Sequence, residues 1–199
     1  MRQRSGAFHN EMDKNVLFLD CETYSKLDLP ERGLDNYARA AHMHMLAYAL
    51  NRRKVQVWFP RKEEMPEESS LLLRSPNIIK IAWNAQFERT IFRHVLGLEI
   101  PIPEWRDPLV IARSLSLPGG LEKTGEILKL NADEAKFPDG KRLIKLFCEP
   151  NGEEGQETLF GVSSGFNDEG THPEDWKKFV DYCIRDVEAE RTLWYKMLP

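Results

Sequence analysis

Two short stretches of the sequence place oxygen-bearing side chains at spacings that suit a metal-dependent reaction. Asp20 and Glu22 close an apolar run that begins near residue 15. Residues two apart on a strand point to the same face, so both carboxylates can converge on one point while Cys21 faces the other way. Tyr182 and Asp186 stand four residues apart in a segment with helical periodicity, which places them on one helical face.

A third carboxylate, Glu88, ends the phrase Asn84-Ala-Gln-Phe-Glu88. This phrase follows a predicted strand and opens a predicted helix, at the edge where open α/β sheets bind ligands. Each signal alone has a simpler interpretation: solvated turn carboxylates, a core tyrosine beside an exposed aspartate, or an acid that favours a helix N-terminus. Together they indicate a cluster of hard oxygen ligands, which suits Mg²⁺ or Mn²⁺.

The elements that would position these groups alternate along the chain. Apolar runs predict strands at 15–20, 44–50, 54–59, 77–83 and 105–107, and the second and third of these read as an antiparallel hairpin. Helical spacing predicts helices at 67–74, 85–96, 108–117, 121–130, 140–147 and 173–198. A loop with Pro30 and Gly33 is predicted after the first strand, and a long mobile loop at 149–171. This order is typical of a layered α/β domain.

The bulk properties agree with a single soluble domain. The 199 residues suit one core, and we expect a flexible leader at 1–14 before a domain at 15–199. No apolar run is long enough for a membrane span, so no membrane partner is expected. The net charge of −4 argues against binding duplex nucleic acid through a broad basic face. Three cysteines are too few for a disulfide framework, and reduced thiols in the cytoplasm are the simplest interpretation.

The order and spacing of the acidic phrases resemble the DEDD superfamily of 3′→5′ exonucleases in its tyrosine-bearing form. Over nearly the whole chain the sequence is similar to the proofreading domain of bacteriophage family A DNA polymerases. The phrases that carry this resemblance are Leu19-Asp-Cys-Glu-Thr23, Trp83-Asn-Ala-Gln-Phe-Glu-Arg89, Leu117-Pro-Gly-Gly-Leu-Glu122, Pro138-Asp-Gly-Lys-Arg-Leu-Ile144 and Asp181-Tyr-Cys-Ile-Arg-Asp-Val-Glu188. The resemblance implies a ribonuclease-H-like α/β fold: a mixed five-stranded sheet that begins with an antiparallel three-stranded part and is flanked by helices.

The resemblance also implies hydrolysis with two divalent cations, Mg²⁺ or Mn²⁺. Asp20, Glu22 and Asp186 would hold the ion that activates water, and Asp20 would bridge to a second ion near Glu88. Tyr182 would orient the attacking water, since an unperturbed phenol with a pKa of about 10 is a poor base. The sequence departs from the family at Glu88, where aspartate is usual. Glutamate keeps the charge and adds one methylene, which changes the geometry expected for the second ion.

Five further residues are candidates for substrate binding. The backbone around Thr23 could contact the terminal nucleotide, and Asn84 could donate a hydrogen bond to it. Phe87 could stack on a base or belong to the core of its helix. Arg89 and Lys141 could hold backbone phosphates, or could simply lie on a solvated surface.

The expected partner is the 3′ end of single-stranded DNA, together with a DNA polymerase domain or subunit, in the cytoplasm of a bacterium or a phage-infected host. Three alternatives stay open. The first is an RNA exonuclease resembling ribonuclease D, with 2′-hydroxyl contacts that no motif reveals. The second is a non-catalytic module that binds single strands or docks a polymerase. The third is a structure-selective nuclease of the ribonuclease H or resolvase type, which lacks the helical pair of Tyr182 and Asp186.

Overall fold

The main sheet of the computed structural model has five strands in the order β3-β2-β1-β4-β5. The structure describes residues 15–130, 139–150, 157–158, 161–162 and 165–198, so the predicted leader lies outside the described residues. The strands are β1 (Asn15–Ser25), β2 (Ala41–Leu50), β3 (Gln56–Trp58), β4 (Ile78–Ile81) and β5 (Trp105–Arg106). β1, β2 and β3 pair antiparallel, whereas β4 runs parallel to β1 and β5 runs parallel to β4. The predicted mixed sheet of the ribonuclease-H-like α/β fold is confirmed.

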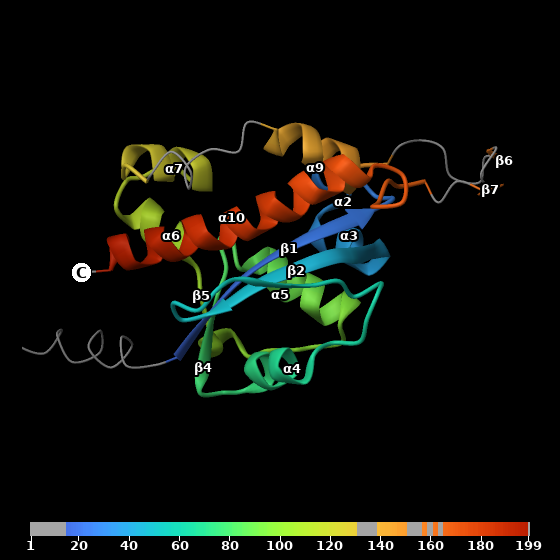
Figure 1. The fold of residues 1–199 in the computed structure, drawn as a ribbon. Coiled ribbons are helices and arrows are strands. Elements are labelled where there is room, and N and C mark those ends of the chain that lie inside the picture. The colour runs from blue at the N-terminus through green and yellow to red at the C-terminus, as the bar shows by residue number, and fades with distance from the viewer. Residues whose placement is uncertain (1–14, 131–138, 151–156, 159–160, 163–164, 199) are drawn as a thin grey trace, which may run out of the picture.

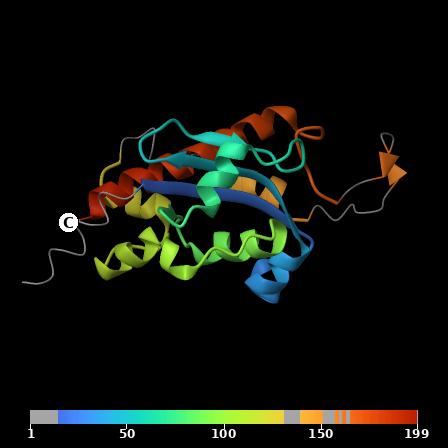
Figure 2. The same ribbon diagram turned by 90° about the horizontal axis from the view of Figure 1, so that it is seen from below.

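Helices cover both faces of this sheet (Figure 1). On one face lie α9 (Gly140–Cys148) and the long α10 (Pro173–Met197). On the other face lie α3 (Leu34–Ala40), α4 (Glu67–Arg74) and α5 (Gln86–Val95). In Figure 2, β1 is seen between the layer with α10 and the layer with α5. Two shorter helices, α6 (Pro108–Ser114) and α7 (Leu121–Ile127), pack against α10.

The central strand β1 is longer than the sequence analysis predicted, continuing to Ser25 rather than ending at residue 20. Its side chains alternate: Leu17 and Leu19 face the layer with α5, whereas Phe18 faces the layer with α10. Pairing with β2 continues past the polar residues, through a register shift between Glu22 and Thr23. Asp20 and Glu22 suggested that the strand ends there, but its pairing with β2 continues on both sides of them. The pair of carboxylates therefore lies within β1, not at its end.

A second correction concerns the segment after β1, which was predicted to be a loop because it contains Pro30 and Gly33. It forms the short helix α2 (Leu29–Arg32), followed at once by α3. Asp28 caps α2 by accepting a hydrogen bond from the backbone N–H of Glu31 at 2.8 Å. Pro30 stands in the first helical turn, where its missing N–H does no harm. Gly33, with φ 75°, makes the sharp turn between the two helices.

α6 and α7 end three residues earlier than predicted. Each stops where a non-glycine residue takes a left-handed conformation, Ser116 with φ 61° and Lys129 with φ 53°. Helices commonly end in this way, but glycine is the usual residue there, so the sequence held no clear stop signal. The other predicted elements lie where they were expected, with boundaries shifted by a few residues, and the predicted hairpin is confirmed as β2 paired with β3.

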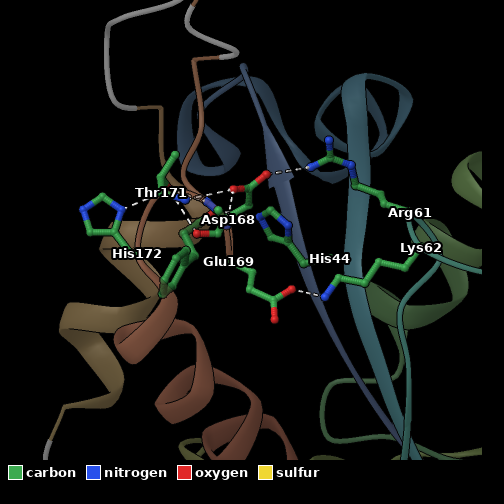
Figure 3. A network of polar contacts seen from close by, with 9 residues as sticks. His44, Arg61, Lys62, Asp168, Glu169, Thr171 and His172 are labelled. Carbon is green, nitrogen blue, oxygen red and sulfur yellow. Dashed lines mark hydrogen bonds and ion pairs between the residues drawn. The ribbon is translucent and has the colours of Figure 1, made fainter. Parts of the chain in front are cut away.

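The predicted mobile loop at 149–171 is only partly among the described residues. It contains a short antiparallel pair, β6 (Glu157–Thr158) and β7 (Gly161–Val162). Its last part packs against the domain. Asp168 forms an ion pair with Arg61 at 3.9 Å, and Glu169 pairs with Lys62, as Figure 3 shows. Residues 165–171, which come just before α10 in the chain, were predicted to be mobile. The structure corrects this, because ion pairs and ring contacts attach them to the rest of the domain.

None of the helices in the described part of the chain is long and apolar enough to cross a membrane.

Candidate active site

β1 carries the first pair of predicted site residues. Asp20 and Glu22 point to the face covered by α9 and α10, where Asp20 lies beside Cys183 and Glu22 lies beside Cys148. One ligand atom each from Asp20, Glu22 and Cys183 lie within 4.8 Å of one another. The two-residue period of the strand brings the carboxylates together, and the ladder with β2 fixes their direction.

α10 carries the second pair. Tyr182 and Asp186 are one helical turn apart, and a hydrogen bond between them stabilises the charged form of Asp186. The helix crosses β1, so that Asp186 comes close enough to Asp20 and Glu22 for their charges to repel. Tyr182 also packs against Phe179, with ring centroids 6.5 Å apart and the rings nearly parallel.

The remaining carboxylate, Glu88, is buried in the first turn of α5. Two acidic residues that the sequence analysis did not single out hold the segment before this helix. Asp107 accepts hydrogen bonds from the backbone N–H groups of Asn84 and Ala85 at 3.0 and 3.1 Å. Glu190 accepts a hydrogen bond from the backbone N–H of Trp83 at 2.5 Å. Asn84 is thereby held with φ 67°, a left-handed conformation that asparagine tolerates better than most residues.

These side chains line one cavity of about 430 Å³. All five residues predicted to be catalytic line it, namely Asp20, Glu22, Glu88, Tyr182 and Asp186. So do three of the five predicted substrate-binding residues, Thr23, Asn84 and Phe87. The structure thus brings together side chains from β1, α5 and α10 that lie far apart in the sequence.

The other two predicted substrate-binding residues lie elsewhere. Arg89 and Lys141 are not among the residues that line the cavity, although they belong to α5 and α9, which border it. Lys141 is exposed and Arg89 is half-buried.

The sequence analysis missed a second, largely apolar wall of the cavity. It is made by the start of α2, by Tyr37 of α3 and by Ile144 and Cys148 of α9. The signal that could have found it is weak: Ile144 belongs to a phrase that carried the family resemblance, and Asp28 with Pro30 resembles a helix start. This wall gives the cavity one acidic side and one apolar side.

Burial and mutual repulsion dominate the electrostatics of the acidic side. Burial raises the pKa of Asp20 to about 6, against a hydrogen bond from Cys183 that lowers it. Burial and then the charges of Asp20 and Asp186 raise the pKa of Glu22. Burial and the charge of Asp20 raise the pKa of Glu88 and of Asp186. Four carboxylates in one cavity therefore destabilise one another's charged forms.

A divalent cation fits this donor set. Glu88 offers a buried carboxylate oxygen, Oε2, that has no hydrogen-bond partner. An unpaired buried carboxylate oxygen is costly, and a cation held between neighbouring carboxylates would satisfy it. The donors are oxygens, which Mg²⁺ and Mn²⁺ prefer.

A mixed five-stranded sheet flanked by helices, with these carboxylates and a helical tyrosine at its centre, agrees with the predicted resemblance to DEDD-type nucleases in the tyrosine-bearing form. No protein-family model matches the sequence. The chain is 36% identical over 184 residues to a DNA polymerase of Bacillus phage SP02, and the match covers 89% of this chain. The chain spans 27% of the length of that polymerase. The predicted resemblance to a bacteriophage DNA polymerase is confirmed.

Solved structures with a similar chain path come from both DNA and RNA enzymes. Escherichia coli RNase D, an exoribonuclease involved in structured RNA processing, gives a TM-score of 0.49 at 13% identity, covering 96% of this chain and 40% of that one. The family B DNA polymerase of the hyperthermophilic archaeon Pyrobaculum calidifontis gives a TM-score of 0.49 at 13% identity, covering 94% of this chain and 25% of that one. At 13% identity these two likenesses concern the fold alone.

Proposed function

We propose that this chain hydrolyses DNA from the 3′ end, with divalent cations held by Asp20, Glu22, Glu88 and Asp186. The observation that carries the proposal is the convergence of these four carboxylates and Tyr182 on one cavity. A carboxylate cluster alone would repel a phosphodiester, so the arrangement makes chemical sense only with cations between the two.

The carboxylates have distinct roles in this proposal. Asp20, Glu22 and Asp186 would hold one ion, and Glu88 would contribute with Asp20 to a second. When bound, two divalent cations neutralise the phosphate and supply Lewis-acid activation for in-line displacement. The extra methylene of Glu88 is accommodated by its position in the first turn of α5, where its Oε1 is held by Cys21 and its Oε2 is free.

In the reaction, water attacks the terminal phosphorus, the bond from phosphorus to the 3′ oxygen breaks, and a nucleoside 5′-monophosphate leaves. Tyr182 orients the water. Its pKa lies above the usual range, because burial and the charges of Asp186 and Glu22 disfavour the phenolate. The neutral hydroxyl can hold the water by a hydrogen bond but is not the base.

The apolar wall of the cavity suits the last base of the strand. Phe87 lies at this wall, with its ring centroid 6.1 Å from that of Tyr37, and offers a face on which a base can stack. The exposed Asn84 can donate to the nucleotide, while the Thr23 side chain is engaged with the Tyr37 hydroxyl at 2.9 Å and leaves its backbone for this role. Arg89 and Lys141 would contact phosphates further along the strand.

The relative is named a DNA polymerase, which favours DNA over RNA and suggests a polymerase domain as the functional partner. We propose that the chain removes mispaired nucleotides from a primer end, in the cytoplasm of a bacterium or a phage-infected host. A primer with a mispaired 3′ end should then be shortened faster than a paired one. Equal rates on the two primers would contradict the proofreading role while leaving the exonuclease intact.

The direct test is digestion of a 5′-labelled single-stranded DNA oligonucleotide with Mg²⁺, with Mn²⁺ and with EDTA. We expect a metal-dependent ladder that shortens from the 3′ end and is absent with Asp20→Ala. An RNA oligonucleotide of the same sequence measures the sugar preference, and faster digestion of the RNA would replace DNA by RNA as the substrate. No cleavage of either strand by the folded protein would contradict the proposed function.

A further inference from the structure

All three cysteines of the chain contact carboxylates on the acidic side of the cavity, each a different one. The Cys183 thiol donates to Oδ2 of Asp20 at 3.3 Å. The Cys148 thiol donates to Oε2 of Glu22 at 3.5 Å. The Cys21 thiol donates to Oε1 of Glu88 at 3.8 Å.

The three thiols come from three elements on both sides of the sheet. Cys183 lies on α10 and Cys148 on α9, which face the carboxylates of β1. Cys21 lies on β1 but points to the opposite face, where it meets Glu88 of α5. Cys21 and Cys183 are buried and Cys148 is half-buried, and none is in a disulfide. Each of three carboxylates thus has one sulfur beside it, and the sulfurs approach from different elements. Packing of small apolar residues would not by itself require this arrangement.

A thiol is an unusual partner for a carboxylate, because it is a weak donor. A hydroxyl or an ammonium group would satisfy the oxygen more strongly and would compete with a cation for its charge. A weak S–H donor can fix the direction of the carboxylate and leave most of its charge available. Each of the three thiols contacts only one oxygen of its carboxylate, and any second contact of the thiol is to the backbone. In Glu88, the oxygen that Cys21 does not contact is buried and has no hydrogen-bond partner.

We infer that Cys21, Cys148 and Cys183 are positioning residues that orient Glu88, Glu22 and Asp20, respectively, for binding divalent cations. This inference rests on the proposed function, because it concerns the same cluster. Groups that hydrogen-bond metal-binding side chains commonly contribute about 10- to 100-fold to metal affinity or activity. A weak donor places the expected effect at the lower end of that range.

The chemical state of the thiols agrees with this role. A thiol with an ordinary pKa of about 8.5 is protonated at neutral pH and can donate. Each of the three thiols lies within hydrogen-bond distance of its carboxylate and can donate to it.

The experiment replaces each cysteine by alanine and by serine in the full chain. Binding of Mn²⁺ is measured from the magnetic resonance signal of the free ion, and cleavage of single-stranded DNA is measured across Mn²⁺ concentrations. We expect each alanine variant to need about tenfold more Mn²⁺ for half-maximal binding and for half-maximal cleavage. Serine keeps a donor and should recover part of the loss.

The matched control is Ser69→Ala. Ser69 is buried on α4 and donates to the Tyr48 hydroxyl at 2.6 Å, so its loss removes a buried hydrogen bond away from the cavity. This variant should be destabilised without any change in its Mn²⁺ requirement. If Cys21→Ala or Cys183→Ala fails to fold, Cys148→Ala decides, because its side chain is only half-buried.

The outcomes separate the inference from the proposed function. Alanine variants that bind Mn²⁺ and cleave like the wild type would overturn the inference and leave the exonuclease intact. Equal losses with alanine and with serine would also overturn it, since donor chemistry would then not matter. A wild-type protein that neither binds Mn²⁺ nor cleaves would overturn the proposed function, and the inference with it.

Discussion

Gly140 lies directly against the ring of Tyr182. A Cβ atom at position 140 would stand 2.8 Å from Cε2 and 3.2 Å from Cδ2 of that ring. Atoms of this kind do not approach so closely, so any larger residue must push the ring away. The first residue of α9 therefore sets the position of the tyrosine on α10, and glycine at 140 is needed for space rather than for a left-handed backbone.

The first prediction concerns Gly140→Ala. Displacing the Tyr182 ring should slow cleavage by about 10- to 100-fold, because a shift of about 1 Å in an orienting group is enough for losses of this size. Mn²⁺ binding should weaken less than cleavage, since every carboxylate is kept and only the hydrogen bond from Tyr182 to Asp186 is disturbed. The double variant with Tyr182→Phe should be no slower than Tyr182→Phe alone, which kinetics at saturating Mn²⁺ can measure.

The control for this variant is Gly120→Ala. An added Cβ at Gly120 meets nothing within 4 Å, and the residue has an ordinary φ of −83°. Its cleavage rate should equal that of the wild type. Additive losses in the double variant of Gly140 and Tyr182 would show that the glycine acts elsewhere.

The second prediction ranks the predicted catalytic residues. Asp20→Ala and Asp186→Ala should abolish cleavage while the protein stays folded, because each removes a cation ligand. Tyr182→Phe should slow the reaction less, because it removes only an orienting hydrogen bond. Single-turnover rates together with circular dichroism test the order. Loss of folding in both aspartate variants would instead identify these residues as structural.

The site residues that sequence could predict are those related by local periodicity. Asp20 and Glu22 share a face because side chains on a strand alternate with a period of two. Tyr182 and Asp186 share a face because residues four apart lie on the same side of a helix. The mixed five-stranded sheet with its antiparallel part followed from the same patterns and from the family resemblance. Local rules of this kind need no knowledge of the tertiary structure.

What sequence could not predict depends on contacts across the chain. The thiol of Cys148 meets Glu22 across 126 positions, and Glu190 meets the backbone of Trp83 across 107 positions. Neither spacing leaves a periodic signal. The helix α2 was missed for another reason: proline and glycine mark helix starts and stops as well as loops, and only the Asp28 cap distinguishes the two.

The third prediction is that one substitution at Asp20 abolishes activity and increases stability. Asp20→Asn removes one of four repelling carboxylates, so in EDTA it should raise the free energy of unfolding by about 1–3 kcal/mol while abolishing cleavage. Chemical denaturation in EDTA measures the first effect, and digestion of labelled DNA measures the second. Saturating Mn²⁺ should reverse the order, because the wild type then gains more from binding the ion.

The difference in stability between the wild type and Asp20→Asn should depend on pH, because the pKa of Asp20 is raised. Its folded value of about 6 lies above the unfolded value of 3.8, so protonation stabilises the fold below pH 3.8, and this stability is lost as the pH rises through about 6. Without metal, the advantage of Asp20→Asn should therefore grow between about pH 4 and about pH 7. His42 and His44, with pKa values lowered to about 4, shift stability the opposite way in both proteins, so only the difference between the two proteins at each pH is diagnostic. A constant difference would contradict the assignment.

The last prediction concerns Asp107, which ties the start of α6 to the segment that leads into α5. Its Oδ1 accepts from Asn84 at 3.0 Å and from Leu109 at 2.9 Å, and its Oδ2 accepts from Ala85 at 3.1 Å. Asp107→Asn keeps one oxygen and can preserve two of these three bonds, whereas Asp107→Ala loses all three. Loss of a helix cap alone costs about 1 kcal/mol, and the part-buried N–H groups of Ala85 and Leu109 that lose their acceptor add to this.

We expect a graded result for this pair of variants. Asp107→Ala should be destabilised by about 2–3 kcal/mol and should bind DNA more weakly, because the strained backbone of Asn84 loses its support. Asp107→Asn should fall between alanine and the wild type in both measurements. Denaturation midpoints and the KM for an oligonucleotide test the grading. A KM that stays constant while stability falls would mean that Asp107 supports the fold without positioning Asn84 for the substrate.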